Sequence, residues 1–439
     1  MILSLDIGTT GTKALLINHK GEIYSSGYAP HKTFTSEEGW IEQNPAEWWM
    51  AVSFATKQAL KNLTQTDLYK ILAITICGQM QDLILLDAEK HLNNALLYSD
   101  SRATHEILEI ETNFGKNKLI EISGNIQKAN SPFAKWLWLK NYESAKINAC
   151  QYILFGAHDY IASQLCDTYS IDFTTASTTG FLNLKNKDWD KEFLAFLHLN
   201  SEILPKIQQA GSIVGYVSKR AANFLELPAG IPVFQGTGDL AALIAITGNN
   251  PHIYLGTSGW IAIPKQYESR NPDIFTAIHP DAKRYIHAVP QPVAGKQLEF
   301  FYHTEKYSRS NEQLANSHFP TNFSDLSLDT TAHENYSATM KNIAMAYRTS
   351  LDLLEILDSQ SLFLTGGGAN SSRGCQIISN ILGHSITVPT HPSYTVALGA
   401  ASLVSEAIGW NKDIIIDEIF AHSYTYQPQI LSDLVSSQP

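Results

Sequence analysis

Cysteine is scarce in this chain, and the cysteines that occur form no recognisable pattern. No Cys-x-x-Cys pair occurs, so the sequence indicates neither a zinc site nor a disulfide framework. The four cysteines among the 439 residues are Cys77, Cys150, Cys166 and Cys375. Cys77 and Cys375 lie in or beside apolar runs, where a free cysteine behaves as a small core residue.

Long hydrophobic runs are also missing. No segment approaches 18 uninterrupted apolar residues, the length that a membrane-spanning helix requires. The amino terminus has neither the basic stretch nor the long apolar stretch of a secretory signal. We therefore expect a protein that does not enter the membrane and is located in the cytoplasm.

Positive charge is in short supply as well. The chain has 31 Lys and Arg residues against 42 Asp and Glu residues, which gives a net charge of −11. This balance argues against broad nucleic-acid binding, which requires a basic face. An anionic substrate must be captured by local groups rather than by the field of the whole protein. The length predicts two or three folding units, because single cores rarely grow beyond ~250–300 residues.

The first seventeen residues carry the most informative motif. The segment MILSLDIGTTGTKALLI contains an apolar strand that ends at Asp6, a turn rich in glycine and threonine, and a second apolar strand after Lys13. Glycines in the turn leave main-chain amides accessible to a phosphate group. A carboxylate cannot bind phosphate directly, so Asp6 indicates an intervening cation such as Mg²⁺. The alternative is an ordinary hairpin turn, and the G-x-x-x-x-G-K-[ST] pattern of a P-loop is absent.

A shorter echo of this motif begins near residue 250. Aligning Gly8 with Gly256 matches a turn of small hydroxyl residues and glycine, flanked in both copies by apolar strands. Tyr254 stands at the position of Asp6, so the two copies cannot have the same chemistry. Two such hairpins facing one another could hold the phosphates of a nucleotide from both sides.

Asp239 is the best candidate for a catalytic residue. It follows a Gly-Thr-Gly turn and begins the predicted helical segment DLAALIAITG. A carboxylate at this place could accept the proton of a hydroxyl group that attacks a γ-phosphate. The competing interpretation is a helix N-cap, a position that aspartate favours without any catalytic role.

Polar side chains follow two predicted strands, at 71–77 and 83–86. Gln79, Gln81 and Asp82 come after the first strand, and Asp100 and Arg102 come after the second. The carboxyl ends of strands are where α/β proteins bind ligands. These groups offer the mixed donors and acceptors that hydroxyl recognition requires. The alternatives are polar loop residues and, for Asp100 and Arg102, an exposed ion pair.

Other segments bear on the organisation of the chain. Residues 156–165 are expected to be helical, with His158, Asp159 and Tyr160 as surface or interdomain polar groups. The glycine turn at 366–368 joins a predicted strand to a predicted helix, and adenosine could lie across it. A plain tight connection is the alternative there. The spacing is not the G-x-G-x-x-G of a dinucleotide fold.

Three expectations concern the carboxy-terminal half. Residues 304–337 are polar and irregular and are expected to form a surface loop or lid. Residues 335–357 have an apolar stripe at helical spacing and are expected to form a long helix. The last helix is expected at 395–408, where small residues would permit close packing.

Taken in order, these segments resemble the FGGY family of carbohydrate kinases, within the actin/hexokinase/Hsp70 ATPase superfamily. The segments that carry the resemblance are LDIGTTGTKALLI, GWIEQNPAEWW, CGQM followed by LILLD, the D-x-R of residues 100–102, GTGDLAA, LGTSG and LTGGGANS. The resemblance is greatest to the xylulokinases. It implies an α/β fold of two actin-like (ribonuclease H-like) domains flanking a catalytic cleft. Residues 1–248 would be the sugar-binding domain and residues 249–439 the ATP-binding domain.

The resemblance also implies ATP- and Mg²⁺-dependent phosphorylation of a sugar or polyol hydroxyl group. Asp239 would be the general base, and the implied metal-site residues are Asp6 and Asp239. The implied substrate-binding residues are Gln79, Met80, Gln81, Asp82, Asp100 and Arg102. The implied ATP-binding residues are Thr9, Thr10, Thr12, Lys13, Gly256, Thr257, Ser258, Gly367, Gly368 and Asn370.

Several positions depart from the family pattern. Gln81 stands where xylulokinases have a histidine, Asp82 replaces a small residue, and Tyr98 replaces the tryptophan of W-x-D-x-R. The region 300–335 is short and lacks the P-Y-L-x-G-E-R segment of many relatives. The identity of the sugar or polyol therefore stays open.

Other classes of function stay open too. One alternative is a catalytically weak or silent relative that binds a sugar or nucleotide as a sensor. Another is an Hsp70-like ATPase, which is disfavoured because no peptide-binding β-domain is recognisable after residue 410. A third is a kinase for a non-sugar polyol. Neither nucleic acid nor membrane is expected as a partner, and self-association into a homodimer is left open.

Overall fold

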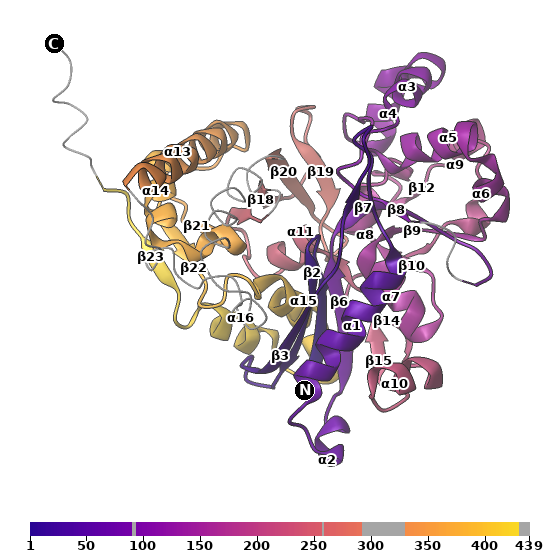
Figure 1. The fold of residues 1–439 in the computed structure, drawn as a ribbon. Coiled ribbons are helices and arrows are strands. Elements are labelled where there is room, and N and C mark those ends of the chain that lie inside the picture. Colours follow the sequence, from indigo (N-terminus) through magenta and orange to yellow (C-terminus); the bar gives the residue numbers. More distant parts are fainter. Residues whose placement is uncertain (90–93, 257–258, 292–329, 430–439) are drawn as a thin grey trace, which may run out of the picture. The chain divides into compact units, whose positions relative to one another are not determined.

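A computed structural model describes residues 1–89, 94–256, 259–291 and 330–429 of the chain. The chain divides into two compact units (Figure 1). The first unit comprises Met1–Ile246, Lys265–Ile286 and Val396–Glu418, and the second comprises Thr247–Pro264, His287–Thr395 and Ile419–Pro439. The chain therefore leaves the first unit after residue 246 and returns to it twice.

The first unit is built on a central mixed sheet. Its strands are Ile2–Ile7 (β1), Gly11–Ile17 (β2), Ile23–Pro30 (β3), Ala73–Gly78 (β6), Ile213–Tyr216 (β14), Pro232–Phe234 (β15) and Thr237–Gly238 (β16). The order is β14-β15-β6-β1-β2-β3, and β16 also pairs with β6. Strands β1, β2 and β3 are antiparallel neighbours, whereas β6 runs parallel to β1, β15 and β16.

A second sheet in this unit has the strand order β4-β5-β8-β7-β9. These strands are Phe34–Thr35 (β4), Ile41–Gln43 (β5), Met80–Leu86 (β7), Ala95–Leu96 (β8) and Tyr152–Gly156 (β9). Two short pairs complete the β structure: Ser170–Asp172 (β10) with Lys206–Gln208 (β13), and Leu182–Asn183 (β11) with Asp188–Trp189 (β12). Strands β6 and β7 are separated only by Gln79, so this residue links the two sheets.

Helices cover both faces of the central sheet. The helices of the first 246 residues are Pro45–Leu60 (α1), Gln65–Leu68 (α2), Thr104–Ile110 (α3), Lys116–Ser123 (α4), Pro132–Tyr142 (α5), Ser144–Ala149 (α6), Ala157–Cys166 (α7), Phe173–Ser177 (α8), Lys191–Phe196 (α9), Lys219–Leu225 (α10) and Asp239–Ile244 (α11). Two later helices are Thr395–Ser405 (α15) and Lys412–Phe420 (α16). Of the described helices, none is long and apolar enough to cross a membrane.

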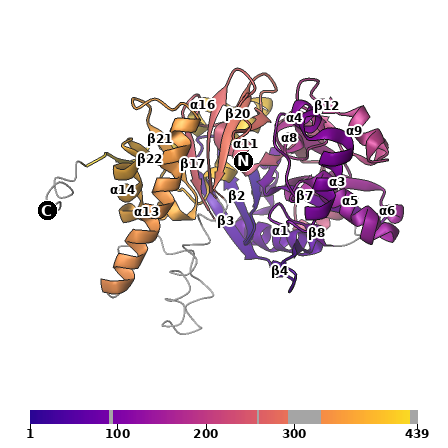
Figure 2. The same cartoon turned by 90° about the horizontal axis from the view of Figure 1, so that it is seen from above.

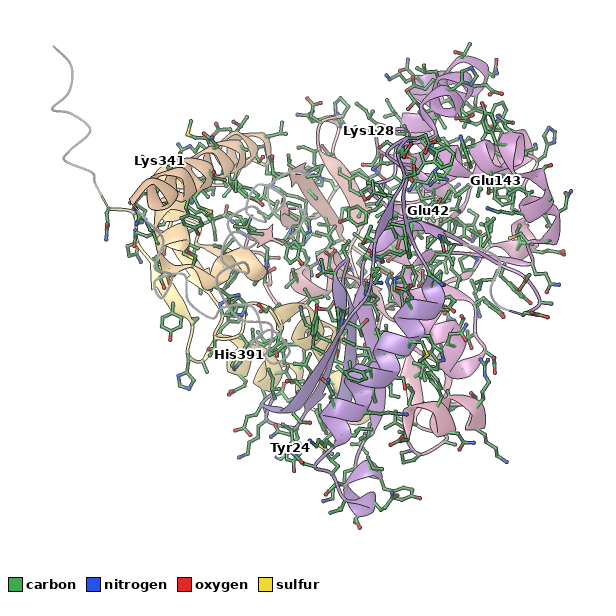
Figure 3. All side chains as sticks on the ribbon, in the orientation of Figure 1. Tyr24, Glu42, Lys128, Glu143, Lys341 and His391 are labelled. Carbon is green, nitrogen blue, oxygen red and sulfur yellow. The ribbon has the colours of Figure 1, made fainter. Side chains whose placement is uncertain are left out.

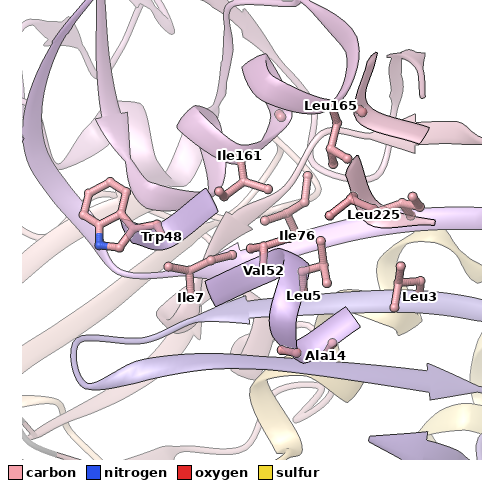
Figure 4. Close-up of a cluster of buried hydrophobic side chains, with 14 of the residues drawn as sticks. Leu3, Leu5, Ile7, Ala14, Trp48, Val52, Ile76, Ile161, Leu165 and Leu225 are labelled. Atoms are coloured by element: carbon pink, nitrogen blue, oxygen red, sulfur yellow. The ribbon is translucent and has the colours of Figure 1, made fainter. Parts of the chain in front are cut away.

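Alternate residues of β1 point to opposite faces of the sheet, and both faces are buried. Leu3, Leu5 and Ile7 belong to a hydrophobic cluster with side chains of α1, α7 and α10 (Figure 4). On the other face, the Ser4 hydroxyl donates to the main-chain oxygen of Ala397 in α15, at 2.7 Å. The continuous apolar sequence of β1 is therefore explained by burial on both sides.

The small residues near position 400 permit close helix packing, as predicted. A Cβ atom at Gly399 would lie 2.1 Å from the main-chain oxygen of Ala242 in α11. Only glycine fits there, so α15 rests directly on the helix that begins with Asp239.

The second unit is built on a sheet that includes the order β18-β17-β21-β22-β23. These strands are His252–Leu255 (β17), Gly259–Lys265 (β18), Leu362–Thr365 (β21), Ile386–Val388 (β22) and Tyr424–Tyr426 (β23). Figure 2 shows Thr330–Leu353 (α13) and Ser372–Leu382 (α14) beside this sheet. The apolar stripe predicted for the long helix is confirmed, since Met340, Ala344 and Tyr347 are fully buried. Of the two remaining strands, Phe275–Ile278 (β19) belongs to the first unit, and Tyr285–Gln291 (β20) crosses the boundary between the units after Ile286.

The echo seen in the sequence is also an echo in the structure. β1 pairs antiparallel with β2 and parallel with β6. β17 likewise pairs antiparallel with β18 and parallel with β21. Gly8 and Gly256 thus follow equivalent strands of two units that share one core topology.

The carboxy-terminal predictions need two corrections. The helix predicted at 395–408 ends at Ser405 with a short 3₁₀ turn after it, and α16 and β23 follow it, so it is not the last element. The long helix begins at Thr330, five residues before the predicted start. Of the predicted loop at 304–337, residues 304–329 lie outside the described residues.

Candidate active site

Three parallel strands of the first unit end at one edge of the sheet. Asp6 lies near the end of β1, Gln79 follows β6, and Asp239 follows β16. In the sheet register Asp6 is opposite Cys77, and Gly238 is opposite Gly78. The carboxyl ends of parallel strands form the usual ligand edge of an α/β sheet. The structure therefore brings together the predicted base, the predicted metal ligand and the start of the predicted sugar-binding segment.

Glycines allow these strand ends to approach each other. A Cβ atom at Gly78, whose φ is +150°, would lie 2.2 Å from the main-chain oxygen of Ile7. A Cβ atom at Gly238 would lie 2.2 Å from the sulfur atom of Met80. Met80 consequently packs over the residue that precedes Asp239, which places it beside the predicted base.

Asp239 is the first residue of α11 and is not its N-cap. The N-cap is Gly238, and no side chain caps the helix. One Asp239 oxygen accepts a hydrogen bond from the Leu240 amide at 2.7 Å. The interpretation of Asp239 as a capping residue is thereby excluded. Burial, reinforced by the negative charge of Asp6, raises the pKa of Asp239 to about 7 despite the Leu240 hydrogen bond.

Asp6 and Lys13 face each other across the β1–β2 hairpin. They are register partners, and the Lys13 Nζ atom lies 3.3 Å from the Asp6 carboxylate. Asp6 is 5% exposed, and its charge acts on Asp239. Two carboxylates that repel each other in this way suit a cation. Among the described residues no group of three or more His, Cys, Asp or Glu side chains could hold a metal by itself.

The glycine-threonine turn between β1 and β2 is tightly closed. The Gly8 amide donates to the Gly11 oxygen at 3.1 Å. Thr9 and Thr10 lie at the bend, and Thr10 is exposed. Thr12 is fully buried within β2, so of the three threonines it is the one enclosed by protein.

The predicted sugar-binding segment begins with an unusual backbone conformation. Gln81 has a φ of +68°, in the left-handed region that is uncommon for residues other than glycine. Met80 and Gln81 are partly exposed, whereas Asp82 is fully buried. Asp82 accepts a hydrogen bond from the Tyr98 amide at 2.9 Å. Burial raises the pKa of Asp82 above its ordinary value, although the buried Lys135 ammonium opposes this shift.

Asp100 and Arg102 form a buried ion pair, which excludes the exposed pair considered above. The Arg102 Nη2 atom lies 2.8 Å from Asp100 and 2.7 Å from Glu42, which is labelled in Figure 3. Asp100 also accepts the Ile41 amide at 2.6 Å. The guanidinium carbon lies 4.4 Å from the ring centre of Trp40 and 4.9 Å from that of Trp138. This network ties the segment after β8 to strand β5.

The prediction for His158 and its neighbours is wrong. His158 and Asp159 are 0% exposed and Tyr160 is 3% exposed, so they are core residues of α7 rather than surface groups. The His158 Nε2 atom lies 3.3 Å from Asp159 and 3.6 Å from Asp172. Although burial alone lowers the pKa of His158, these carboxylates raise it above its ordinary value.

Asp172 connects this buried group to β16, the strand that precedes Asp239. It caps α8 through the Thr174 and Thr175 amides and also accepts the Thr237 hydroxyl at 2.8 Å. Asp172 was not predicted from the sequence. Its one available signal was an aspartate before two threonines, a common N-cap pattern.

The predicted adenosine turn in the second unit has the expected strand-turn-helix form. Gly366 has a φ of +93°, and a Cβ atom there would lie 2.5 Å from the Leu255 oxygen. Gly367 faces open space, since a Cβ atom there would meet no atom within 4 Å. Asn370 donates to Ser393 at 3.2 Å. Gly256 ends the described part of the second hairpin bend, and the predicted contacts Thr257 and Ser258 lie outside the described residues.

The raised pKa of Asp239 predicts how an Asp239→Asn variant changes stability with pH. Ionised Asp239 destabilises the folded state, because the folded pKa lies above the value of an unfolded aspartate. The variant should therefore melt at a higher temperature than the parent at about pH 8 and at the same temperature at about pH 4. Thermal melts in EDTA without nucleotide would check this. Equal melting temperatures at the higher pH would contradict the raised pKa.

Comparisons with known proteins give relatives along almost the whole chain. The chain is 26% identical to a xylulose kinase of Escherichia coli (strain K12), covering 94% of this chain and 92% of that protein. A solved xylulose kinase from Rhodospirillum rubrum superposes with a TM-score of 0.80 at 22% identity, covering 98% of this chain and 94% of the other. A gluconate kinase from Lactobacillus acidophilus also superposes with a TM-score of 0.80, at 21% identity, covering 98% and 93%. These structural likenesses show the shared two-domain actin-like α/β fold.

Family models decide the classification. The N-terminal domain model of the FGGY family of carbohydrate kinases matches residues 1–245, and the C-terminal domain model matches residues 276–407. The first match alone covers more than half of the chain, including the strand-end carboxylates. The chain therefore belongs to the FGGY family of carbohydrate kinases and is a carbohydrate kinase.

Proposed function

We propose that this protein transfers the γ-phosphoryl group of ATP to a hydroxyl group of a sugar or polyol, with Mg²⁺ and with Asp239 as general base. The observation that carries the proposal is the position of Asp239. It follows a parallel strand and lies beside Met80, and the negative charge of Asp6 helps to raise its pKa. The resulting pKa of about 7 suits a base that works near neutral pH.

In the proposed reaction the Asp239 carboxylate accepts the proton of the substrate hydroxyl group. The hydroxyl oxygen forms a bond to the γ-phosphorus, and the bond from that phosphorus to the bridging oxygen of ADP breaks. ADP leaves with the bonding electron pair, and the sugar phosphate remains. Most of the catalytic effect in such transfers comes from positioning and electrostatic stabilisation.

Asp6 and Asp239 are the residues that would hold Mg²⁺. When bound, the cation would neutralise charge on the phosphate oxygens. Thr9, Thr10 and Lys13 of the first unit would contact phosphate, as would residues of the second hairpin. The open turn at Gly367 would accept the adenosine. Thr12 is buried, so its contribution would be to shape the turn.

A pentulose such as xylulose is the first substrate to test. Curated relatives along most of the chain are xylulose kinases. The solved structures with similar folds include enzymes for gluconate and glycerol as well, so the fold alone does not choose among these substrates. Gln81 replaces the histidine of the xylulokinase pattern and is therefore the residue most able to change which sugar or polyol is preferred as substrate.

A coupled assay of ADP release tests the proposal directly. Pentuloses, hexuloses, polyols and aldonates are offered one at a time with ATP and Mg²⁺. We expect ADP release that depends on one of these alcohols and stops when EDTA removes the cation. Release of ADP that does not depend on an added alcohol would contradict the proposal and indicate an ATPase. No release with the whole panel would contradict it too and favour a sugar- or nucleotide-binding protein.

Three further expectations stay proposals. The boundary at residue 248 would separate a sugar-binding part from an ATP-binding part of the chain. A cytoplasmic location stays a prediction as well, and self-association into a homodimer stays open. Sedimentation of the purified protein would decide the oligomeric state.

A further inference from the structure

The side chain of Gln43 is fully buried in the first unit and makes four hydrogen bonds to other segments. Gln43 ends β5 and is 0% exposed. Its Nε2 atom donates to the Thr9 main-chain oxygen and to the Thr33 hydroxyl, each at 2.7 Å. Its Oε1 atom accepts from Trp48 Nε1 and from Gln79 Nε2, each at 2.8 Å. Both ends of the amide are therefore fully used.

Two of these partners fix which way the Gln43 amide points. The indole nitrogen of Trp48 can only donate, so the atom facing it must be the Gln43 oxygen. The main-chain oxygen of Thr9 can only accept, so the atom facing it must be the Gln43 nitrogen. The orientation of Gln43 follows from its neighbours without any assumption about hydrogen positions.

The orientation of Gln43 then dictates that of Gln79. Since the Gln43 oxygen accepts, Gln79 must present its NH₂ group to it and turn its own oxygen away. Gln79 is 5% exposed, and its Oε1 atom has no hydrogen-bond partner within the described part of the chain. A buried acceptor without a partner is unfavourable unless a ligand supplies a donor. A sugar hydroxyl group is such a donor.

We infer that Gln43 is a positioning residue with two roles. It fixes which atom of the Gln79 amide faces the sugar site at the end of β6, and it links this edge of the sheet to the phosphate-binding turn at Thr9. Through one amide it holds Gln79 with the carbonyl oxygen free and holds the main chain of Thr9 in place. The inference rests on the proposed function, because it takes the end of β6 as part of the sugar site. It predicts that the substrate donates a hydroxyl hydrogen to Gln79.

The test compares Gln43→Met with Gln164→Met. Gln164 is also 5% exposed, but it lies in α7, and its contacts are with Arg220. In Gln43→Met the Gln79 amide can turn over, so the KM for the preferred sugar should rise at least about tenfold. Gln164→Met should keep a KM within about twofold of the parent. Adding Gln43→Met to a Gln79→Met variant should change the KM little further, because the two residues act through one contact.

Hydrogen–deuterium exchange supplies a readout that needs no activity. Peptides containing residues 8–12 should exchange faster in Gln43→Met, because the main-chain oxygen of Thr9 loses its hydrogen bond from Gln43 and the turn is held less firmly. In Gln164→Met they should exchange at the parental rate. Unchanged exchange in this turn, or an unchanged KM in Gln43→Met with only lower stability, would overturn the inference. If the parent protein releases no ADP with any alcohol, the proposed function fails. The exchange experiment still tests whether Gln43 holds the turn at residues 8–12 in place.

Discussion

Asp239→Asn should lower kcat by at least about 10²-fold, while the variant stays folded. The amide keeps the size of the carboxylate and can still accept the hydrogen bond from Leu240. It cannot take the proton of the attacking hydroxyl group. We expect the KM for the sugar to change much less than kcat, because the loss concerns the transition state rather than binding. Steady-state ADP release over a range of sugar concentrations measures both constants.

Asp273→Asn is the matched control for this experiment. Asp273 is an exposed residue of the first unit, and the substitution makes the same chemical change away from the strand ends. Its kcat should stay within about twofold of the parent, as is usual for surface substitutions. A near-normal kcat in Asp239→Asn would remove Asp239 as the base. Equal losses in both variants would indicate a nonspecific effect of charge.

Arg102→Met should destabilise the protein by about 3–5 kcal/mol, the range observed when one partner of a buried ion pair is removed. Asp100 is 0% exposed. Burial alone would raise its pKa, but hydrogen bonds from Arg102 and the Ile41 amide hold the pKa below its ordinary value. Without the guanidinium group this carboxylate is left charged and buried. Urea unfolding at neutral pH would measure the change.

Two further variants make the result specific. Lys57→Met breaks an exposed pair with Glu226, whose side chains are 41% and 68% exposed, and should change stability by about 0–1 kcal/mol. The double variant Asp100→Asn with Arg102→Met should be less destabilised than the sum of the two single variants, because no buried charge is stranded. An Arg102→Met protein as stable as Lys57→Met would show that the buried pair contributes little.

Local patterns predicted much of the fold. Asn44 caps α1 with Pro45 at its first position, a local pattern that is typical of a helix start. The hairpin after Met1, the long helix near residue 340 and the strand-glycine-helix unit near residue 366 were each predicted from apolar spacing and glycine. These features depend on neighbours within a few residues. The sequence echo predicted the two hairpins, but the parallel pairings of β1 with β6 and of β17 with β21 join strands far apart in the sequence and were not predicted.

The site was predicted in part. Asp239, Asp6 and the segment after β6 were identified because acidic and polar side chains follow apolar strands, and parallel strands end at one edge. Gln43 and Asp172 were missed. Their partners lie at residues 9, 33, 48 and 79 for Gln43 and at residue 237 for Asp172. No spacing along the chain shows such contacts.

Polar groups inside the fold were the least predictable feature. His158 and Asp159 have the composition of surface residues, yet they are fully buried beside Asp172. Asp100 and Arg102 have the sequence of an exposed pair, yet Asp100 is fully buried and the Arg102 guanidinium lies over the rings of Trp40 and Trp138. Polarity predicts exposure only when no partner is available. In both cases a further partner came from another element: Asp172 for His158 and Glu42 for Arg102.

The sequence by itself determined the repeated hairpin, the long helix and the acids at the strand ends, because these depend on side-chain periodicity and on residues close together in the chain. The tertiary structure alone decided that α15 returns to pack on α11, that Asp239 has a pKa near 7, and that Gln79 presents an oxygen. Each of these depends on burial and on contacts between segments far apart in the sequence, and the free energy of such contacts is defined only once the chain has folded.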